Sequence, residues 1–284
     1  MLGPFRCYRF RLFDRNCLLV KSGIGLKRAM DATYALLAAT SPQFLVSFGV
    51  AGAVNDDLRI GDVIVASNTC LLDKGIPSQF QRLAPLSDAA RHAATQALQQ
   101  RGARFVSGTA ITTRGSQVVQ LQPKEMAHPV LEMETAGVAR VAAEQGISLM
   151  ALRAVSDGPQ APLPFSIEAV TDEELNPRIG KIIKTILRHP QIVLQFRWLG
   201  RNVEKAAENA AIALVAALSQ PLPVVSPSHR RDRGRRRAQP SVGCRGADQL
   251  RRDRRVLCHL RRRVDGSHRT FALALHSHFH FKEI

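Results

Sequence analysis

Short aliphatic runs alternate with longer segments of helical period through residues 17–157. The runs are rich in β-branched residues and predict strands at 17–20, 44–48, 62–66, 105–112 and 149–155. Apolar positions at helical spacing predict helices at 26–39, 87–100, 134–145, 171–187 and about 203–218. Ser87 is expected to be the N-cap of the second helix. The alternation indicates an α/β domain whose helices cover a parallel sheet.

Basic residues are concentrated after residue 220. The chain has 284 residues with 40 Lys and Arg against 23 Asp and Glu, and residues 221–284 hold 16 of the basic and 5 of the acidic ones. Hydrophobic residues make up 45% of the chain, which is enough for a sizeable core and excludes disorder throughout. We therefore predict a folded domain at 1–220 and a basic, low-complexity, disordered tail at 221–284.

The arginine-rich tail has several interpretations. It could bind nucleic acid or an acidic surface by counterion release, but no motif with known groove geometry accompanies the charge, so a solvated extension is simpler. GC-rich coding sequence translated out of frame would give a similar composition. His276, His278 and His280 alternate as metal ligands could, without an acidic or cysteine partner. Deleting residues 221–284 is accordingly predicted to leave the activity of the folded domain intact.

Neither a membrane span nor a cysteine framework is indicated. The longest apolar run, Ala210 to Leu218, is about half of the roughly 20 residues that cross a bilayer. The five cysteines are scattered and never spaced as C-x-x-C, so neither disulfides nor a zinc site is expected. These features favour a cytoplasmic protein without a metal or organic cofactor.

Glycines follow two of the predicted strands. The segment Lys21-Ser22-Gly23-Ile24-Gly25 follows the first strand, and Gly49-Val50-Ala51-Gly52-Ala53 follows the second. Glycine lets the backbone approach a ligand closely and can present amides where a helix begins. A simple strand-to-helix turn and close backbone packing are the alternative explanations.

Acidic residues follow two other predicted strands. Leu131-Glu132-Met133-Glu134-Thr135 leads into a helix, and Arg153-Ala154-Val155-Ser156-Asp157-Gly158 ends a very apolar strand. Carboxylates at helix N-termini often serve as caps, which is the alternative for each residue taken alone. Ligands bind at the carboxyl ends of strands in α/β sheets, so the joint occurrence of acids and glycine turns favours a site.

Four of these segments resemble the nucleoside phosphorylase and nucleosidase family in order and spacing. They are V-K-S-G-I-G, G-V-A-G-A-V with L-R-I-G-D-V-I-V, L-E-M-E-T-A-G-V-A and R-A-V-S-D. The likeness is greatest to the bacterial 5'-methylthioadenosine/S-adenosylhomocysteine nucleosidases and covers about residues 17–190. It implies a three-layer α/β/α sheet and hydrolysis of the N-glycosidic bond of an adenine nucleoside, with release of adenine.

The resemblance also implies roles for individual residues. Asp157 is the expected catalytic acid, which gives a proton to N7 of the departing purine, while Ser156 orients its carboxyl group and Arg153 supports the loop. Glu134 is expected to accept the ribose 2' and 3' hydroxyls. The other expected substrate-binding residues are Met133 beside the sugar, Ile24 on the 5' side, Glu132, Val50, Ala51 and Gly52. Core filling is the alternative for Met133.

Some positions depart from the family pattern. Family members begin with a strand and a loop carrying a Glu that activates water, and this unit is expected to be missing here, which would expose a strand edge. Phosphorylases carry an Arg where this chain has Ser47, and many relatives carry Ser where it has Val50, so hydrolysis is favoured. The segment S-F-G-V-A-G also resembles hopanoid-associated phosphorylases. No counterpart of the family's base-recognising segment is found at 113–119.

Family members form dimers or larger oligomers in which an aromatic residue of one subunit closes the site of its neighbour. The resemblance therefore implies a homo-oligomer, with Phe165 as the candidate aromatic residue. An alternative of another class is an inactive fold that binds nucleic acid or an acidic partner through the tail.

Overall fold

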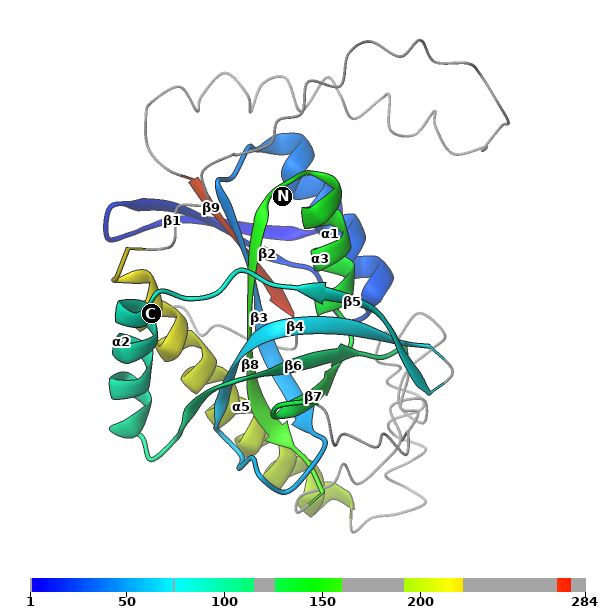
Figure 1. The fold of residues 1–284 in the computed structure, drawn as a ribbon, viewed down its shortest axis with the longest axis vertical. Coiled ribbons are helices and arrows are strands. Elements are labelled where there is room, and N and C mark those ends of the chain that lie inside the picture. The colour runs from blue at the N-terminus through cyan, green and yellow to red at the C-terminus, as the bar shows by residue number, and fades with distance from the viewer. Residues whose placement is uncertain (1, 74, 115–125, 160–191, 222–269, 277–284) are drawn as a thin grey trace.

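The computed structural model describes residues 2–73, 75–114, 126–159, 192–221 and 270–276. Figure 1 shows one mixed sheet with helices packed against it. The elements, in chain order, are β1 Arg6–Leu12, β2 Arg15–Lys21, α1 Leu26–Ala39, β3 Phe44–Ala53, β4 Val63–Asp73, β5 Ile76–Arg82, α2 Asp88–Gln99, β6 Phe105–Thr112, β7 Pro129–Glu132, α3 Thr135–Glu144, β8 Ser148–Asp157, α5 Ile192–Leu218 and β9 Thr270–His276.

The sheet has nine strands in the order β1-β2-β9-β3-β7-β6-β4-β5, and β8 pairs with both β3 and β4. Strands β2, β9, β3 and β8 run parallel to one another. Four neighbouring pairs are antiparallel, namely β1 with β2, β3 with β7, β4 with β5 and β4 with β8. The sheet is therefore mixed, and the expectation of a parallel sheet is wrong for these pairs.

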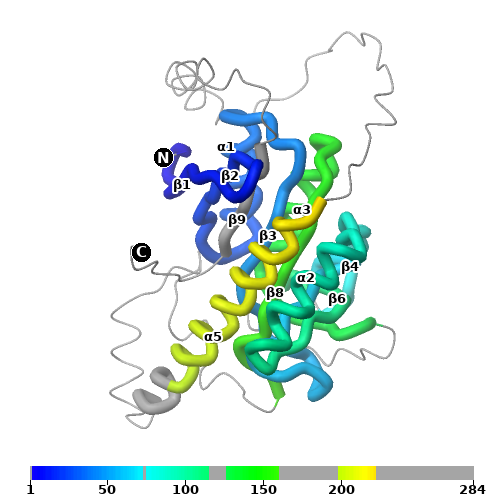
Figure 2. Tube along the Cα trace, turned by 90° about the vertical axis from the view of Figure 1, so that its left-hand side faces the viewer, coloured from blue at the N-terminus to red at the C-terminus, as the bar shows by residue number. Residues whose placement is uncertain are grey.

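Helices cover both faces of the sheet, because strand side chains alternate between the faces. On β3, Phe44, Val46 and Phe48 join a buried cluster with residues of α2 and α5, the α2–α5 cluster. Leu45 points the other way, into the α1–α3 cluster, which is built with residues of α1 and α3. Figure 2 shows α5 crossing the strands beside α2. The expected three-layer α/β/α arrangement is confirmed.

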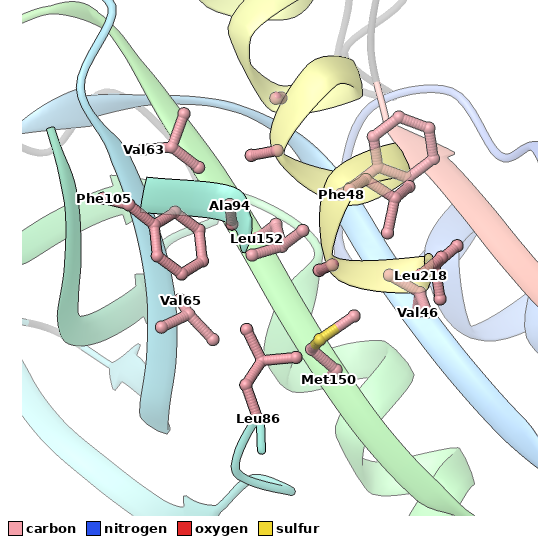
Figure 3. Close-up of a cluster of buried hydrophobic side chains, with 14 of the residues drawn as sticks. Val46, Phe48, Val63, Val65, Leu86, Ala94, Phe105, Met150, Leu152 and Leu218 are labelled. Carbon is pink, nitrogen blue, oxygen red and sulfur yellow. The ribbon is translucent and has the colours of Figure 1, made fainter. Parts of the chain in front are cut away.

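The α2–α5 cluster is a close-packed core. Figure 3 shows the strand side chains Phe48 of β3, Val63 of β4, Phe105 of β6 and Leu152 of β8 together with Leu218 of α5. Met150 and Leu152 of β8 are fully buried in it. Removing such side chains leaves cavities that cost about 2 to 5 kcal/mol each, so this cluster anchors β3 and β8, the two strands that carry the site.

Most helix ends lie where the sequence pattern places them. Helix α1 has the expected bounds, and Ser87 caps α2 by accepting a hydrogen bond of 3.3 Å from the Ala90 amide. Helix α5 begins at Ile192, earlier than the expected 203. The expected helix at 171–187 lies outside the described residues. None of the helices that the structure describes is long and apolar enough to cross a membrane.

Four strands were missed in the sequence, each for a physical reason. Strands β1 and β5 are edge strands with largely exposed side chains, so neither has the apolar face that marks a strand. Strand β7 has four residues, too few for a pattern. Strand β9 belongs to the segment that we expected to be disordered. For Thr270–His276 that expectation is wrong, because these residues form a strand in the interior of the sheet.

The place of β9 also bears on the expected open edge. Among the described strands, β9 separates β2 from β3 and pairs with both. The sequence predicts an exposed strand edge without saying which one, and in the structure the facing edges of β2 and β3 are both covered by β9.

Candidate functional site

The glycine and acidic segments meet at one edge of the sheet. Because β2, β3 and β8 run parallel, their carboxyl ends lie at the same edge. That edge holds the loop 22–25 after β2, the last residues of β3 from Gly49 onward, and Ser156 with Asp157 at the end of β8. Strand β3 continues to Ala53, so its glycines lie within the strand rather than in a turn after it.

Three strands converge on the last residues of β3. Strand β8 follows one edge of β3 from Phe44 to Gly52. The other edge is shared: β9 follows it up to Gly49, and β7 approaches from the opposite direction and pairs at Gly52 and Ala53. Gly52 thus has Leu131 of β7 on one side and Asp157 of β8 on the other. Neighbouring strands lie about 4.8 Å apart, so Leu131 and Asp157 are only two strand spacings apart.

Glu134 lies three residues beyond Leu131, at the start of α3. Its side chain is buried, and its carboxylate Oε1 accepts a hydrogen bond of 2.9 Å from the Gly25 amide at the start of α1. Gly25 has a φ of 104°, which favours glycine at this position. The two helices approach closely, since a β-carbon on Gly137 of α3 would lie 2.7 Å from the carbonyl oxygen of Leu26.

The environment of Glu134 favours its neutral form. Burial, together with the nearby carboxylate of Glu132, raises the pKa of Glu134 to about 7, against the opposing effects of Arg153 and of the Gly25 and Met133 amides. A carboxyl group with this pKa changes its charge near neutral pH. Its ionised form, which predominates above that pH, can accept hydrogen bonds from the hydroxyl groups of a ligand.

Glu132 is a structural carboxylate that orders the start of α3. Its Oε2 accepts from the amides of Glu134 and Thr135 at 3.0 and 2.8 Å, and Arg153 Nη2 lies 2.8 Å away. Burial raises the pKa of Glu132, but Arg153 and the donors of Thr112 and Thr135 outweigh this effect, so the pKa lies below its ordinary value. Glu132 therefore stays ionised beside Glu134.

Arg153 is fully buried and its donors are used within the protein. Besides Glu132, its Nη2 donates to the hydroxyl oxygens of Ser47 and Thr135, at 2.9 and 2.7 Å, and its Nη1 donates to the Leu152 carbonyl. Glu132 was expected to bind substrate and Arg153 to support the loop, but their contacts in the structure indicate that both hold Glu134 in place.

Sequence reasoning did not assign three hydroxyl residues of this cluster. Thr112 at the end of β6 donates to Glu132 Oε1 and accepts from the Ala136 amide at 2.8 Å. Thr135 and Ser47 complete the shell around Arg153. Thr112 ends an apolar strand that meets this edge of the sheet, a signal that could have pointed to it.

Asp157 stands on a bulge in β8. Ala51 of β3 pairs with Val155, whereas the next residue, Gly52, pairs with Asp157, so Ser156 is the extra residue. A bulge re-aims side chains and is common beside active sites. Here Ser156 Oγ lies 2.6 Å from Asp157 Oδ1 and donates to it. Asp157 is partly exposed, and burial raises its pKa while the bond from Ser156 opposes the rise.

Other expected site residues occupy different environments. Val50 packs its side chain against the α2–α5 cluster, on the opposite face of β3 from Ser47 and Arg153. Only the backbone of Val50 is then available at the site. Ala51 and Met133 are buried, and Ile24 is partly exposed in the loop before α1.

Asp62 is a further buried carboxylate, but its oxygens are already used. They accept from the amides of Arg59 and Arg104 and from the Arg104 guanidinium, at 2.6 to 2.9 Å. Asp62 therefore has a structural role, because it links the segments that contain Arg59 and Arg104. Among the described residues, His, Cys, Asp and Glu form no group of three that could hold a metal ion.

Several sequence-based expectations lie outside the described residues. They concern Phe165, most of the segment 113–119, His278 and His280, and the arginine runs between 230 and 263.

A family model described as Phosphorylase superfamily matches residues 3–188, which is more than half of the chain. The chain belongs to the phosphorylase superfamily. A similar curated protein is the 5'-methylthioadenosine/S-adenosylhomocysteine nucleosidase of Geobacillus thermodenitrificans, strain NG80-2. It is 26% identical over 194 residues, which cover 63% of this chain and 77% of that protein. The resemblance found in the sequence motifs is thereby confirmed for this superfamily.

Solved structures show the same phosphorylase superfamily fold. One is the 5'-methylthioadenosine/S-adenosylhomocysteine nucleosidase of Neisseria meningitidis in complex with methylthio-immucillin-A, with a TM-score of 0.54 and 20% identity over 76% of this chain and 86% of that one. Another is the futalosine hydrolase of Helicobacter pylori strain 26695, with a TM-score of 0.54 and 20% identity over 77% and 86%.

Proposed function

We propose that the protein hydrolyses the N-glycosidic bond of an adenine nucleoside of the methylthioadenosine or S-adenosylhomocysteine type and releases adenine. The observation that supports the proposal is the strand register at the end of β3, where Gly52 has Asp157 on one side and Leu131, three residues before Glu134, on the other. The names of the similar proteins support the same reaction class, since both methylthioadenosine/S-adenosylhomocysteine nucleosidases and a futalosine hydrolase are among them.

Asp157 is the proposed acid. Breaking the bond between C1' and N9 leaves a cationic sugar and an anionic base, so a proton delivered to N7 removes the charge on the base. Such catalysis contributes about 10² to 10⁴-fold. Burial raises the pKa of Asp157, which favours the protonated form, and Ser156 holds the carboxyl group in one orientation. Water then adds to C1' and releases a proton, which restores the acid.

Glu134 is the proposed sugar carboxylate. Its ionised form would accept the 2' and 3' hydroxyl groups and place negative charge beside the positive charge that develops on the sugar. Its position is set by the Gly25 amide on one side and by the cluster of Glu132 and Arg153 on the other. The sugar is thereby fixed relative to Asp157, which is what effective proton transfer requires.

The hydrogen bonds that Arg153 already makes within the protein favour hydrolysis over phosphorolysis. A phosphate ion needs a cation with free donors, and an arginine supplies the bidentate geometry. Arg153 has no solvent exposure, and its donors are directed to Glu132, Ser47, Thr135 and the backbone. The alternative, a phosphorylase such as the hopanoid-associated type, would require this cluster to open.

The test is release of free adenine from methylthioadenosine and from S-adenosylhomocysteine, measured with and without phosphate. Hydrolysis gives a free sugar at the same rate in both conditions, whereas a sugar 1-phosphate would support the phosphorylase alternative. Asp157→Asn is expected to abolish release. The matched control is Asp14→Asn, because the Asp14 side chain is 78% exposed and lies on the turn between β1 and β2. If the unmodified chain released no adenine, the alternative of an inactive fold that acts as a binding protein would be favoured.

A homo-oligomer remains part of the proposal. Support comes from the edge strand β5, where Ile76 and Phe80 are 69% and 61% exposed, since exposed apolar side chains favour association. Light scattering on the purified protein tests this, and a single-chain mass would contradict it.

A further inference from the structure

The chain fills the middle of its sheet with a segment from its far end. Strand β9, drawn in red in Figure 1, lies between β2 and β3 and runs parallel to both. Ala272 is in register with Leu18 on one side and with Leu45 on the other. In a parallel strand with two neighbours, backbone groups bond alternately to either side, so almost every amide of β9 has a partner strand.

Strand β9 is what joins the β1–β2 hairpin to the rest of the sheet. In the described part of the chain, β2 pairs with β1 and β9 only, and the edge of β3 from Phe44 to Gly49 pairs with β9. Yet β2 is a core strand, since Cys17 and Val20 are both 1% exposed. Without β9, β2 and β3 would each present an unpaired edge to the gap between them.

The same strand leads to the site. The end of β9 at His276 is opposite Gly49, and Leu275 is opposite Lys21, the last residue of β2. The loop that follows Lys21 contains Gly25, whose amide holds Glu134. The register of β9 therefore sets where Gly25 lies relative to the end of β3.

We propose that Thr270–His276 is an inserted strand that occupies an acceptor site between β2 and β3 of its own chain, and that its insertion positions the Gly25 loop against Glu134. The acceptor is defined by the backbone groups of Asn16–Lys21 and Phe44–Gly49. Hydrogen bonds to both edges offset the conformational entropy that is lost on ordering a short strand more fully than bonds to one edge alone.

Insertion within one chain is favoured over exchange between two. Residues 222–269 connect the end of α5 to β9, and an extended chain advances about 3.3 Å per residue, so this connection reaches across a domain several times over. A segment tethered in this way has an effective concentration on the order of millimolar. A second copy of the chain at micromolar concentration competes poorly with it.

Hydrogen exchange on the full chain is the first test, and it does not depend on the proposed function. The amides of 270–276 are expected to exchange as slowly as those of β2 and β3. Exchange at the rate of an unstructured peptide would overturn the proposal.

A proline variant provides the second measurement. Ala272→Pro removes an amide from the inserted strand and is expected to speed exchange in β2 and at Gly25, with a lower Tm. Ala247→Pro, in the connecting segment, is the matched control and should leave both unchanged. Unchanged exchange in β2 of the Ala272→Pro protein would contradict the proposal. Adenine release, measured separately, bears on the proposed function alone.

A disulfide decides between one chain and two. Asn16 and Thr270 are register partners at the start of the ladder, so Asn16→Cys with Thr270→Cys should form a bond within the monomer on oxidation. Asn16→Cys alone is the control. A covalent dimer specific to the double variant would show exchange between copies and overturn insertion in cis, and failure to form either bond would count against the register.

Discussion

A β-carbon at position 52 would stand 2.7 Å from Oδ2 of Asp157. Gly52 and Asp157 are register partners next to the β8 bulge, so the absence of a side chain on one is what makes room for the carboxyl group of the other. The glycine segment of β3 and the acid at the end of β8, which are separate motifs in the sequence, form one local structure.

Gly52→Ala is therefore expected to displace the Asp157 carboxyl group. A shift of about 1 Å costs on the order of 10²-fold in rate, so adenine release should fall by about that factor. Steady-state kinetics measures this. Gly200→Ala is the control, because a β-carbon there meets nothing within 4 Å in helix α5, and it should stabilise the protein by about 0.5 to 1 kcal/mol. Normal activity in Gly52→Ala would remove Asp157 from the acid role.

Glu134→Gln should stabilise the protein while it weakens substrate binding. The pKa of Glu134 is about 7 in the folded protein, above the ordinary 4.5, so the folded state binds more protons between these values and stability falls as pH rises from 4.5 to 7. The neutral amide of the Glu134→Gln protein does not titrate, so this fall in stability with pH does not occur. The gain should be absent at pH 4 and reach about 1 to 3 kcal/mol at pH 8, as urea unfolding would show. Glu144→Gln, at an exposed pair on the same helix, is the control.

The pH dependence of KM is expected to report the ionisation of the Glu134 carboxyl group. If the sugar hydroxyls require ionised Glu134, KM for methylthioadenosine should fall as pH rises through about 7. In the Glu134→Gln protein, KM should no longer fall as pH rises through this range. A KM that is independent of pH between 6 and 8, in the parent chain, would show that the carboxylate does not contact the sugar.

Ser156→Ala should shift the alkaline limb of the pH profile of kcat. The bond from Ser156 lowers the pKa of Asp157, so its removal raises that pKa and keeps the acid protonated to higher pH. The alkaline limb of kcat should shift upward, while the maximum falls because the carboxyl group is less well oriented. An unshifted limb would mean that another group controls it.

Removing either partner of the buried ion pair between Arg153 and Glu132 should lower the free energy of unfolding. Arg153→Met leaves Glu132 buried and charged, which costs about 3 to 5 kcal/mol. Adding Glu132→Gln to Arg153→Met should recover part of this loss, because no isolated charge is left. Thermal unfolding of the single and double variants checks the coupling, and strictly additive effects would refute it.

The sequence was most informative where one face of an element is apolar. Strand β6 and helix α1 have the expected bounds, because their buried residues recur at a clear period. The sequence motifs also predict Glu134 and Asp157 as the site carboxylates, and their roles stay predictions. The part played by Thr112 could not be predicted in this way, because it depends on β6 and β7 meeting in parallel, with Thr112 opposite Glu132. The apolar run Phe271–Leu275 could have predicted a strand after the arginine-rich segment, but its place between β2 and β3 depends on pairing with residues far away in the sequence.

The position of β9 has a consequence for how the protein is made. Asn16 pairs with Thr270, and Phe44 pairs with Phe271, so contacts near the beginning of the chain await residues close to its end. Pairings between distant residues slow folding, and a nascent chain leaves the ribosome from the N-terminus. Until β9 emerges, the edges of β2 and β3 that it covers are unpaired, and unpaired strand edges are prone to associate with other chains.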